Sequence, residues 1–371
     1  MFLAAALAAG GYASCSAPFD PPALVNSLRV LQVQVNAVAP TNDADGDGVA
    51  DADVDGDGDI DDDDFTTQLS GAYALPGETV NFSMVYADGR DQTEVETSGP
   101  PLITWIGGCW NPPGNDYYGC YAQLGSLFEG LQTGALPPEV GFGPEFNLTV
   151  PTDVLAAVGQ PDAGPRVAIG FIFFIVCAGD LRPVQQEGDT AAGSFPIGCF
   201  DSSGRELGPD GFVPGYTQVY VFEDGRRNAN PVINGILVDG EAPAAQVTVP
   251  ACKVSEDERR KTGCSATDEF AECETVDIDV SVPDDVAEID AGATGAEGEE
   301  LREVVWVSYY ADAGDFDSPT KLVSDAQKGI QGDHGTVWVP PETPGTYSVW
   351  AIVRDNRGGS SLVEQFINVT E

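Results

Sequence analysis

Aspartate dominates one segment near the amino terminus, and its spacing is the clearest chemical signal in the chain. Residues 43–64 hold 12 Asp, and a glycine follows each of two Asp-x-Asp-x-Asp triplets, at Gly48 and Gly58. Alternate residues of a tight loop can all point their oxygens inward, and a residue without Cβ permits the sharp turn that follows. Calcium is a hard cation that takes about six to eight oxygen ligands, so this pattern predicts a calcium site.

The second half of this run resembles the loop of EF-hand-type calcium sites. Counted from Asp53, the ligand positions of such a loop fall on Asp53, Asp55, Asp57, Asp59, Asp61 and Asp64. The resemblance implies that Asp59 offers its backbone carbonyl and that the others offer carboxylates. Because the last position is Asp rather than Glu, the loop is more similar to dockerin and thrombospondin type-3 loops than to calmodulin. A dockerin has a second, paired half, which this sequence lacks, so the resemblance does not imply binding to a cohesin.

The first half of the run fits the same pattern more loosely. Its ligand positions are Asp43, Asp45, Asp47 and Asp51. The last position is Val54, so Asp53 or Asp55 would have to close the site, as in adjacent calcium ions that share ligands. The alternative interpretation is a solvated acidic linker with diffuse counterions. Since so many carboxylates repel one another, we expect the segment to fold only when it binds calcium.

The charge of the whole chain limits its partners. There are 60 acidic and 16 basic residues, a formal net charge of −44, and the excess extends well beyond the Asp run. Such a field repels nucleic acid and anionic lipid headgroups, so we expect no nucleic-acid partner.

Enzyme signatures are missing from the sequence. It contains one histidine and no GxSxG, HExxH or P-loop pattern. His334 lies in a turn-like stretch, which favours an ordinary surface residue. The sequence therefore predicts a protein that is not an enzyme. A hydrolase that uses a pair of carboxylates remains an alternative, because such pairs have no short signature.

The amino terminus carries an export signal. Residues 2–9 are apolar but too few to span a bilayer, and Tyr12-Ala13-Ser14-Cys15 follows. This stretch resembles the lipobox of bacterial lipoproteins, which implies that Cys15 is lipidated and becomes the new amino terminus. The resemblance implies attachment to the outer membrane or cell surface. A plain cleaved secretion signal and an uncleaved anchor are the alternatives.

Seven further cysteines indicate disulfides in an exported protein. They are Cys109, Cys120, Cys177, Cys199, Cys252, Cys264 and Cys273. Proximity favours pairing of Cys109 with Cys120 and of Cys177 with Cys199. Among the last three, one is left over, and the sequence does not indicate which one.

Strands must position these groups, because Gly and Pro are abundant and the apolar segments are short. Strands are expected at 27–38, 101–107, 145–150, 166–177, 216–222, 275–282, 303–310, 336–339, 346–354 and 362–369. Residues 167–176 are almost wholly apolar, which predicts a central strand that is buried on both faces.

The end of the chain resembles polycystic-kidney-disease-type and related immunoglobulin-like folds. The residues that carry the resemblance are Pro344-Gly345-Thr346-Tyr347, the strand after them, and the turn 355–359. Tyr347 stands where a tyrosine corner would fall. The resemblance implies a fold and not an activity.

We therefore predict an all-β chain with two immunoglobulin-like β-sandwich domains and an Asp-rich calcium-loop insertion in the first. The expected parts are a lipoprotein signal peptide with its lipobox (1–15), a tether (16–26), a first sandwich (27–228) with the insertion at 43–69, and a second sandwich (229–371).

The predicted function is a non-enzymatic, calcium-binding cell-surface lipoprotein that serves as a binding or structural module. Its expected partners are the membrane, through lipid on Cys15, and a carbohydrate or protein ligand. An aromatic group that comprises Trp105, Trp110, Tyr117 and Tyr118 could stack on such a ligand or pack in a core beside a disulfide. An adhesin-like carbohydrate- or peptide-binding protein and a secreted carboxylate-pair hydrolase are the alternatives.

Overall fold

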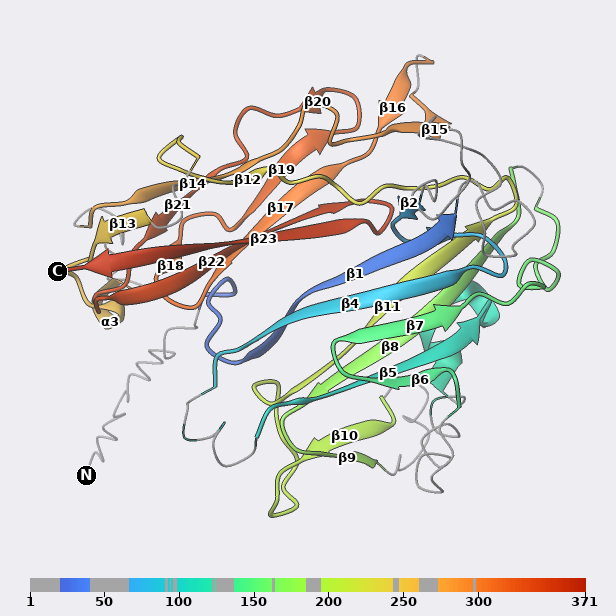
Figure 1. Cartoon of the computed structure of the whole chain (residues 1–371), viewed down its shortest axis with the longest axis horizontal. Coiled ribbons are helices and arrows are strands. Elements are labelled where there is room, and N and C mark those ends of the chain that lie inside the picture. Colours follow the sequence, from blue (N-terminus) through green and yellow to red (C-terminus); the bar gives the residue numbers. More distant parts are fainter. Residues whose placement is uncertain are drawn as a thin grey trace, which may run out of the picture.

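β-Strands form nearly all of the regular structure in the computed structural model of the chain (Figure 1). The structure describes residues 21–40, 67–90, 93, 95, 99–121, 124, 137–161, 164–184, 195–242, 247–259, 273–295 and 298–371. Within these ranges the strands build two pairs of facing sheets, and each pair encloses its own apolar core.

The first pair of sheets is formed by the amino-terminal half of the chain. One sheet has the order β2 (Thr67–Ser70), β1 (Leu28–Pro40), β4 (Thr79–Asp88), β7 (Glu145–Thr149). The other has the order β3 (Tyr73–Ala74), β11 (Phe212–Phe222), β8 (Val167–Cys177), β5 (Leu102–Trp110), β6 (Val140–Phe142). Phe82, Trp105 and Phe174 meet in the core between them. We call this pair the first sandwich.

The second pair of sheets, the second sandwich, is formed by the carboxy-terminal part. One sheet has the order β12 (Gly235–Val238), β14 (Val276–Ser281), β21 (Thr336–Val339), β18 (Asp315–Phe316). The other has the order β13 (Val247–Pro250), β23 (Ser360–Thr370), β22 (Gly345–Asp355), β17 (Val305–Ala311), β19 (Thr320–Asp325), β20 (Gly329–Ile330). Trp338 and Tyr309 are fully buried in its core.

The two sandwiches share one strand order. When the main strands are named A to G along the chain, A, B and E are β1, β4 and β7 in the first sandwich and β12, β14 and β21 in the second. C, F and G are β5, β8 and β11 in the first, and β17, β22 and β23 in the second. A short strand also pairs in parallel with G in both, namely β3 and β13. Sheets that contain A-B-E and G-F-C are the immunoglobulin-like arrangement, so the all-β class is confirmed on topology alone.

The first sandwich carries an additional layer over its five-stranded sheet. This layer contains β9 (Asp180–Pro183), β10 (Ile197–Phe200) and the 3-10 turns η2 (Pro113–Asn115) and η3 (Tyr117–Cys120). The disulfides Cys109–Cys120 and Cys177–Cys199 join it to the ends of β5 and β8, in the pairings that proximity suggested. Phe171 and other outward residues of β8 are consequently buried, which explains why this strand is apolar at nearly every position.

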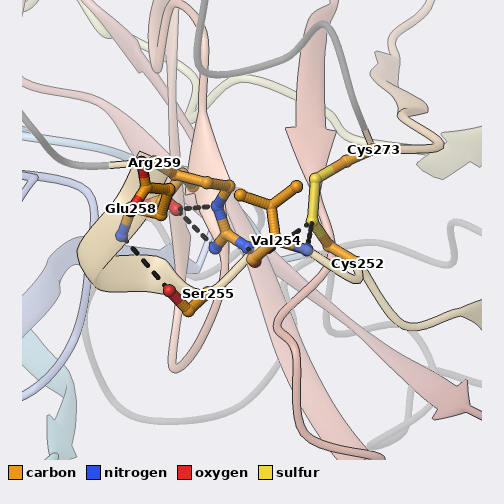
Figure 2. Close-up of a disulfide and its surroundings, with 7 residues drawn as sticks. Cys252, Val254, Ser255, Glu258, Arg259 and Cys273 are labelled. Carbon is orange, nitrogen blue, oxygen red and sulfur yellow. Dashed lines mark hydrogen bonds and ion pairs between the residues drawn. A yellow bond between two sulfur atoms is a disulfide. The ribbon is translucent and has the colours of Figure 1, made fainter. Parts of the chain in front are cut away.

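Smaller elements close the second sandwich. β15 (Ile289–Thr294) and β16 (Glu300–Arg302) form a hairpin, and Cys252 is bonded to Cys273. The short helix α3 (Glu256–Arg259) lies between these two cysteines along the chain (Figure 2). Arg259 donates to the backbone oxygen of Val254, and through Nε and Nη2 it bonds Asp315 Oδ2 at 3.1 and 2.7 Å. Both side chains of this ion pair are buried.

The expected tether at 16–26 is not a free spacer in its described part. Ala23, Leu24 and Val25 are each less than 8 % exposed. Leu24 forms a parallel bridge with Ala311 at the end of β17, and Ala23 belongs to the core of the second sandwich. Residues 21–26 therefore cross the second sandwich before the chain enters the first, because their apolar side chains find a core there.

The two sandwiches contact each other through β1 on one side and β22 and β23 on the other (Figure 1). Leu31 packs with Trp350 and Ile352 in a small apolar cluster. Beside it, Gln32 Nε2 donates to Ser360 Oγ at 3.1 Å, and both residues are buried. The contact therefore combines apolar packing with hydrogen bonds that fix the alignment of the two sheets.

Candidate aromatic binding face

The predicted calcium ligands and the lipidation residue lie outside the described residues, as does Cys264. These are Asp43, Asp45, Asp47, Asp51, Asp53, Asp55, Asp57, Asp59, Asp61, Asp64 and Cys15. The described flanks of the Asp run are paired with each other: Pro40 at the end of β1 lies opposite Thr67 at the start of β2. Within the described ranges, no cluster of three or more His, Cys, Asp or Glu side chains is arranged to hold a metal ion.

The four aromatic residues that the sequence groups together divide into two pairs. Trp105 is fully buried between the sheets of the first sandwich, and its Nε1 donates to the backbone oxygen of Gly143 at 2.8 Å. Trp110 is partly buried against the same core and lies over Gly170, where a Cβ would come within 2.5 Å of its ring. For these two residues, the core-packing interpretation is confirmed.

Tyr117 and Tyr118 instead lie on the outer surface of the first sandwich. The ring of Tyr117 is 3.9 Å from that of Tyr118 and stacks on that of Tyr216 at 4.6 Å. Tyr121 meets both Tyr117 and Tyr118 edge to face, at 5.9 and 5.5 Å. Tyr118 and Tyr216 remain 43 % and 42 % exposed. The four tyrosines form a cluster that is open to solvent on one side.

Local chemistry fixes the loop that carries this cluster. Gly114 and Asn115 have φ of 75° and 54°, a left-handed backbone that these residue types tolerate. The side chain of Asp116 accepts from the backbone N–H of Tyr118, which begins the 3-10 turn η3. The disulfide from Cys120 to Cys109 then ties the end of this turn to β5. The tyrosines are therefore presented on a short, cross-linked loop.

The aromatic surface continues along β11. Val219 and Val221 point into the core, so Tyr216, Gln218 and Tyr220 point outward, by the two-residue period of a strand. Tyr73 on β3 lies beside Tyr220, with its ring 5.8 Å away and 4.7 Å from that of Phe222. Tyr73 is only 9 % exposed, however, and the guanidinium of Arg226 lies over the ring of Phe222, 4.7 Å from its centre. We call the remaining set the tyrosine strip: Tyr117, Tyr118, Tyr216, Gln218 and Tyr220.

Every side chain of the tyrosine strip is uncharged. The hydrogen bond with Tyr118, and then burial, raise the pKa of Tyr117 above that of an ordinary tyrosine. Burial also raises the pKa of Tyr220, so neither phenol ionises near neutral pH. The hydroxyl of Tyr220 donates to Gln218 Oε1 at 2.8 Å. The strip is a neutral surface, with hydroxyl and amide groups between its rings, on a chain with a net charge of −44.

A second candidate is a cleft of about 730 Å³ at the end of the first sandwich, lined by residues that include Arg90, Asp180, Asp201 and Glu206. Asp201 accepts from Ser203 Oγ and from two backbone N–H groups, and these bonds lower the pKa of Asp201 to about 2. A carboxyl that donates a proton in catalysis needs a raised pKa. Asp201 therefore stabilises its own turn and is not suited to that role.

His334 is not an ordinary surface residue. Its side chain is 14 % exposed, and Nδ1 lies 2.6 Å from Asp279 Oδ1. The hydrogen bond to Asp279 raises the pKa of His334, and its backbone oxygen accepts from the hydroxyl of Tyr309 at 2.9 Å. The turn-like sequence hid this contact, because Asp279 is distant along the chain.

The tyrosine corner of the second sandwich is present. The hydroxyl of Tyr347 donates to the backbone oxygen of Thr343 at 2.9 Å, a few residues upstream, at the start of β22.

Comparison with known proteins gives no relative by sequence, since neither a family model nor a curated protein matches the chain. Fibronectin(III)-like modules of CbhA from Clostridium thermocellum match at 11% identity and a TM-score of 0.19, over 81% of this chain and 88% of theirs. Dimeric latent PorU from Porphyromonas gingivalis matches at 11% identity and a TM-score of 0.19, over 91% of this chain but 24% of PorU. At these scores we rest the fold on strand order and nothing on the likeness.

Proposed function

We propose that this chain is an exported, non-enzymatic surface module in which two immunoglobulin-like domains, 27–228 and 229–371, display a binding face. Its Asp-rich loop folds around calcium, and lipid on Cys15 holds it at the outer membrane or cell surface. The binding face is the tyrosine strip, which supports a binding role over a purely structural one.

The pairing of Pro40 with Thr67 supports the calcium loop. The run leaves β1 and returns to β2 at one place, which is compatible with a loop closed by a metal ion. The described flanks thus supply a rigid base, and the loss of freedom on metal binding is confined to the loop. The regular placement of Gly48 and Gly58 in the sequence supports the same proposal.

A calorimetric calcium titration of the full chain, with limited proteolysis at residues 43–70, tests the loop. We expect site-like heat with a Kd of about 10⁻⁴ to 10⁻³ M, and protection of the loop by calcium. The variant Asp53→Asn/Asp57→Asn should lose both effects. The control Asp284→Asn/Asp285→Asn removes the same charge at exposed positions of the second sandwich and should keep them. Absence of heat and protection in the unaltered chain would leave the run as an acidic spacer.

Lipid attachment has its own test. In bacteria fed labelled fatty acid, the chain should take up the label and remain with membranes. The variant Cys15→Ser should lose both. A labelled Cys15→Ser protein would contradict this part of the proposal. Within the described ranges, no helix has the length and apolar character needed to cross a bilayer.

A further inference from the structure

We propose that the tyrosine strip binds a neutral polysaccharide chain. This inference rests on the proposed function, because it names the ligand class of the module's binding face. It starts from the arrangement of Tyr118, Tyr216 and Tyr220 in space, which their positions in the sequence do not reveal.

The strip has the geometry of an extended site. Consecutive residues of a strand rise by about 3.4 Å, so the outward side chains from Tyr216 to Tyr220 span roughly 14 Å. The loop tyrosines, Tyr117 and Tyr118, lengthen it beyond Tyr216, on which Tyr117 stacks. A ligand that contacts the whole strip must therefore be a chain and not a single small molecule.

The chemistry of the strip matches carbohydrate. A sugar ring has a face of C–H groups that packs on aromatic rings and a rim of hydroxyls that need hydrogen-bond partners. The strip supplies rings interleaved with tyrosine hydroxyls and the amide of Gln218, which both donate and accept.

Charge selects for a neutral ligand. The net charge of −44 repels anionic polysaccharides and nucleic acids, because the electrostatic potential of the whole protein acts on every charged ligand that approaches it. A basic peptide would be attracted by that field, but it would be recognised through carboxylates, and the strip has none. An uncharged chain rich in hydroxyls is the ligand that fits both facts.

The strip is also pre-organised. Tyr216 packs edge to face against Phe171, which is 2 % exposed, and the loop of Tyr117 and Tyr118 is fixed by the Cys109–Cys120 disulfide. Rigid aromatic side chains lose little conformational entropy on binding, so more of the contact energy appears as affinity.

Native electrophoresis of the full chain in gels that contain a dissolved polysaccharide tests the proposal. The probes are hydroxyethylcellulose, arabinoxylan, mixed-linkage β-glucan and α-mannan as neutral chains, with polygalacturonate as the anionic chain. We expect at least one neutral chain to retard the protein and polygalacturonate not to do so. The double variant Tyr118→Ala/Tyr216→Ala should weaken binding to that chain at least tenfold, as titration calorimetry would measure it.

Two variants control for folding. Tyr216→Phe keeps the ring that packs on Phe171 and should retain most of the binding. Phe366→Ala removes a ring that is 49 % exposed on the second sandwich and should leave binding unchanged. The inference is overturned if no neutral chain retards the protein. It is equally overturned if the double variant binds like the unaltered chain, or if a basic peptide rather than a polysaccharide binds in a Tyr216-dependent way.

The same proteins, titrated with calcium, separate this inference from the proposed function. Calcium heat that persists in Tyr118→Ala/Tyr216→Ala while polysaccharide binding is lost supports both. Polysaccharide binding without any heat of calcium binding would contradict only the calcium part of the proposed function. Calcium heat without any polysaccharide binding sinks this inference alone.

Discussion

The two sandwiches have the same strand order but differ in how they cover their surfaces. In the first, a layer that two disulfides attach to β5 and β8 covers the outer face of these two strands, whereas Tyr216 on the outer face of β11 is 42 % exposed. In the second, the equivalent sheet packs on the first sandwich through β22 and β23. One fold has therefore been adapted by additions at strand ends, while the core pattern of alternating side chains is kept.

The two sandwiches also differ in the connection between strand A and the short strand that pairs in parallel with G, which runs from β1 to β3 in the first and from β12 to β13 in the second. In the first sandwich it contains the Asp run, between Pro40 and Thr67, whereas in the second only eight residues separate β12 from β13. Loop-closure entropy grows slowly with loop length, so a long insertion at this point costs little stability. Such a site tolerates a functional loop without disturbing the sandwich.

The largest effect should come from the buried ion pair that closes the second sandwich. Asp315→Asn leaves Arg259, whose side chain is 1 % exposed, without its carboxylate. We expect the free energy of unfolding to fall by about 3 to 5 kcal/mol, since a buried charge would be uncompensated. Asp180→Asn, which breaks the exposed pair with Arg182, is the matched control in the first sandwich and should cost about 1 kcal/mol or less. Equal losses in denaturant unfolding would contradict this assignment.

The disulfides should rank by the length of chain that they close. The double variant Cys177→Ser/Cys199→Ser opens a separation of 22 residues and should cost about 3 to 4 kcal/mol. Cys109→Ser/Cys120→Ser opens a separation of 11 and should cost about 0.6 kcal/mol less, because each doubling of loop length adds that amount. Thermal unfolding of both variants measures the difference. The reverse order would show that strain or packing, rather than chain entropy, decides the contribution of these disulfides.

Sequence pattern predicted the long strands well, because burial imposes their periods. The strand expected at 166–177 is observed at Val167–Cys177, and the strand expected at 346–354 is observed at Gly345–Asp355. β11 begins at Phe212 and not at 216 as expected. The expectation was too short because Pro214 and Gly215 are typical of a turn. Both pair with β8, and Gly215 leaves room for the ring of Phe174, where a Cβ would come within 2.3 Å. That requirement comes from a residue on another strand.

The tyrosine strip was only half visible in the sequence. Tyr117 and Tyr118 stood out because they are adjacent and lie near two cysteines. Tyr121, Tyr216 and Tyr220 were missed, although the alternation of Tyr216, Gln218 and Tyr220 with valines did indicate a strand with one polar, aromatic face. Without the topology, nothing connects that face to a loop about a hundred residues earlier in the chain.

A pH-dependent contribution should belong to the second sandwich. Glu303 is 1 % exposed, and burial together with the nearby charge of Asp355 raises the pKa of Glu303 to about 7, against the attraction of Arg357. The folded state therefore holds this proton more tightly than the unfolded chain does. Stability from this group is fully present below about pH 4.5 and is lost as the pH rises through about 7, by roughly 3 kcal/mol.

Glu303→Gln isolates this contribution. The variant should be more stable than the unaltered chain at pH 8, and the difference should vanish near pH 4, in urea unfolding at a series of pH values. Burial also raises the pKa of Asp312, to about 6. Asp312 is left unchanged in this variant, so that any remaining dependence of stability on pH can be assigned to it. A variant whose stability follows the same pH profile as the unaltered chain would show that Glu303 does not titrate in this range.

The smallest expected effect compares the same corner in both sandwiches. The second fixes the start of its F strand with the hydroxyl of Tyr347, and the first uses Arg166, whose Nη1 donates to the backbone oxygen of Leu155 and whose Nη2 pairs with Glu223. Tyr347→Phe removes a single hydrogen bond and should lower the free energy of unfolding by about 1 kcal/mol. Arg166→Gln should cost less, because its ion pair is partly exposed and screened by salt. Added salt should therefore reduce the loss of stability caused by Arg166→Gln and leave the loss caused by Tyr347→Phe unchanged. The opposite response would contradict the assignment of an ion pair to the first corner and a neutral hydrogen bond to the second.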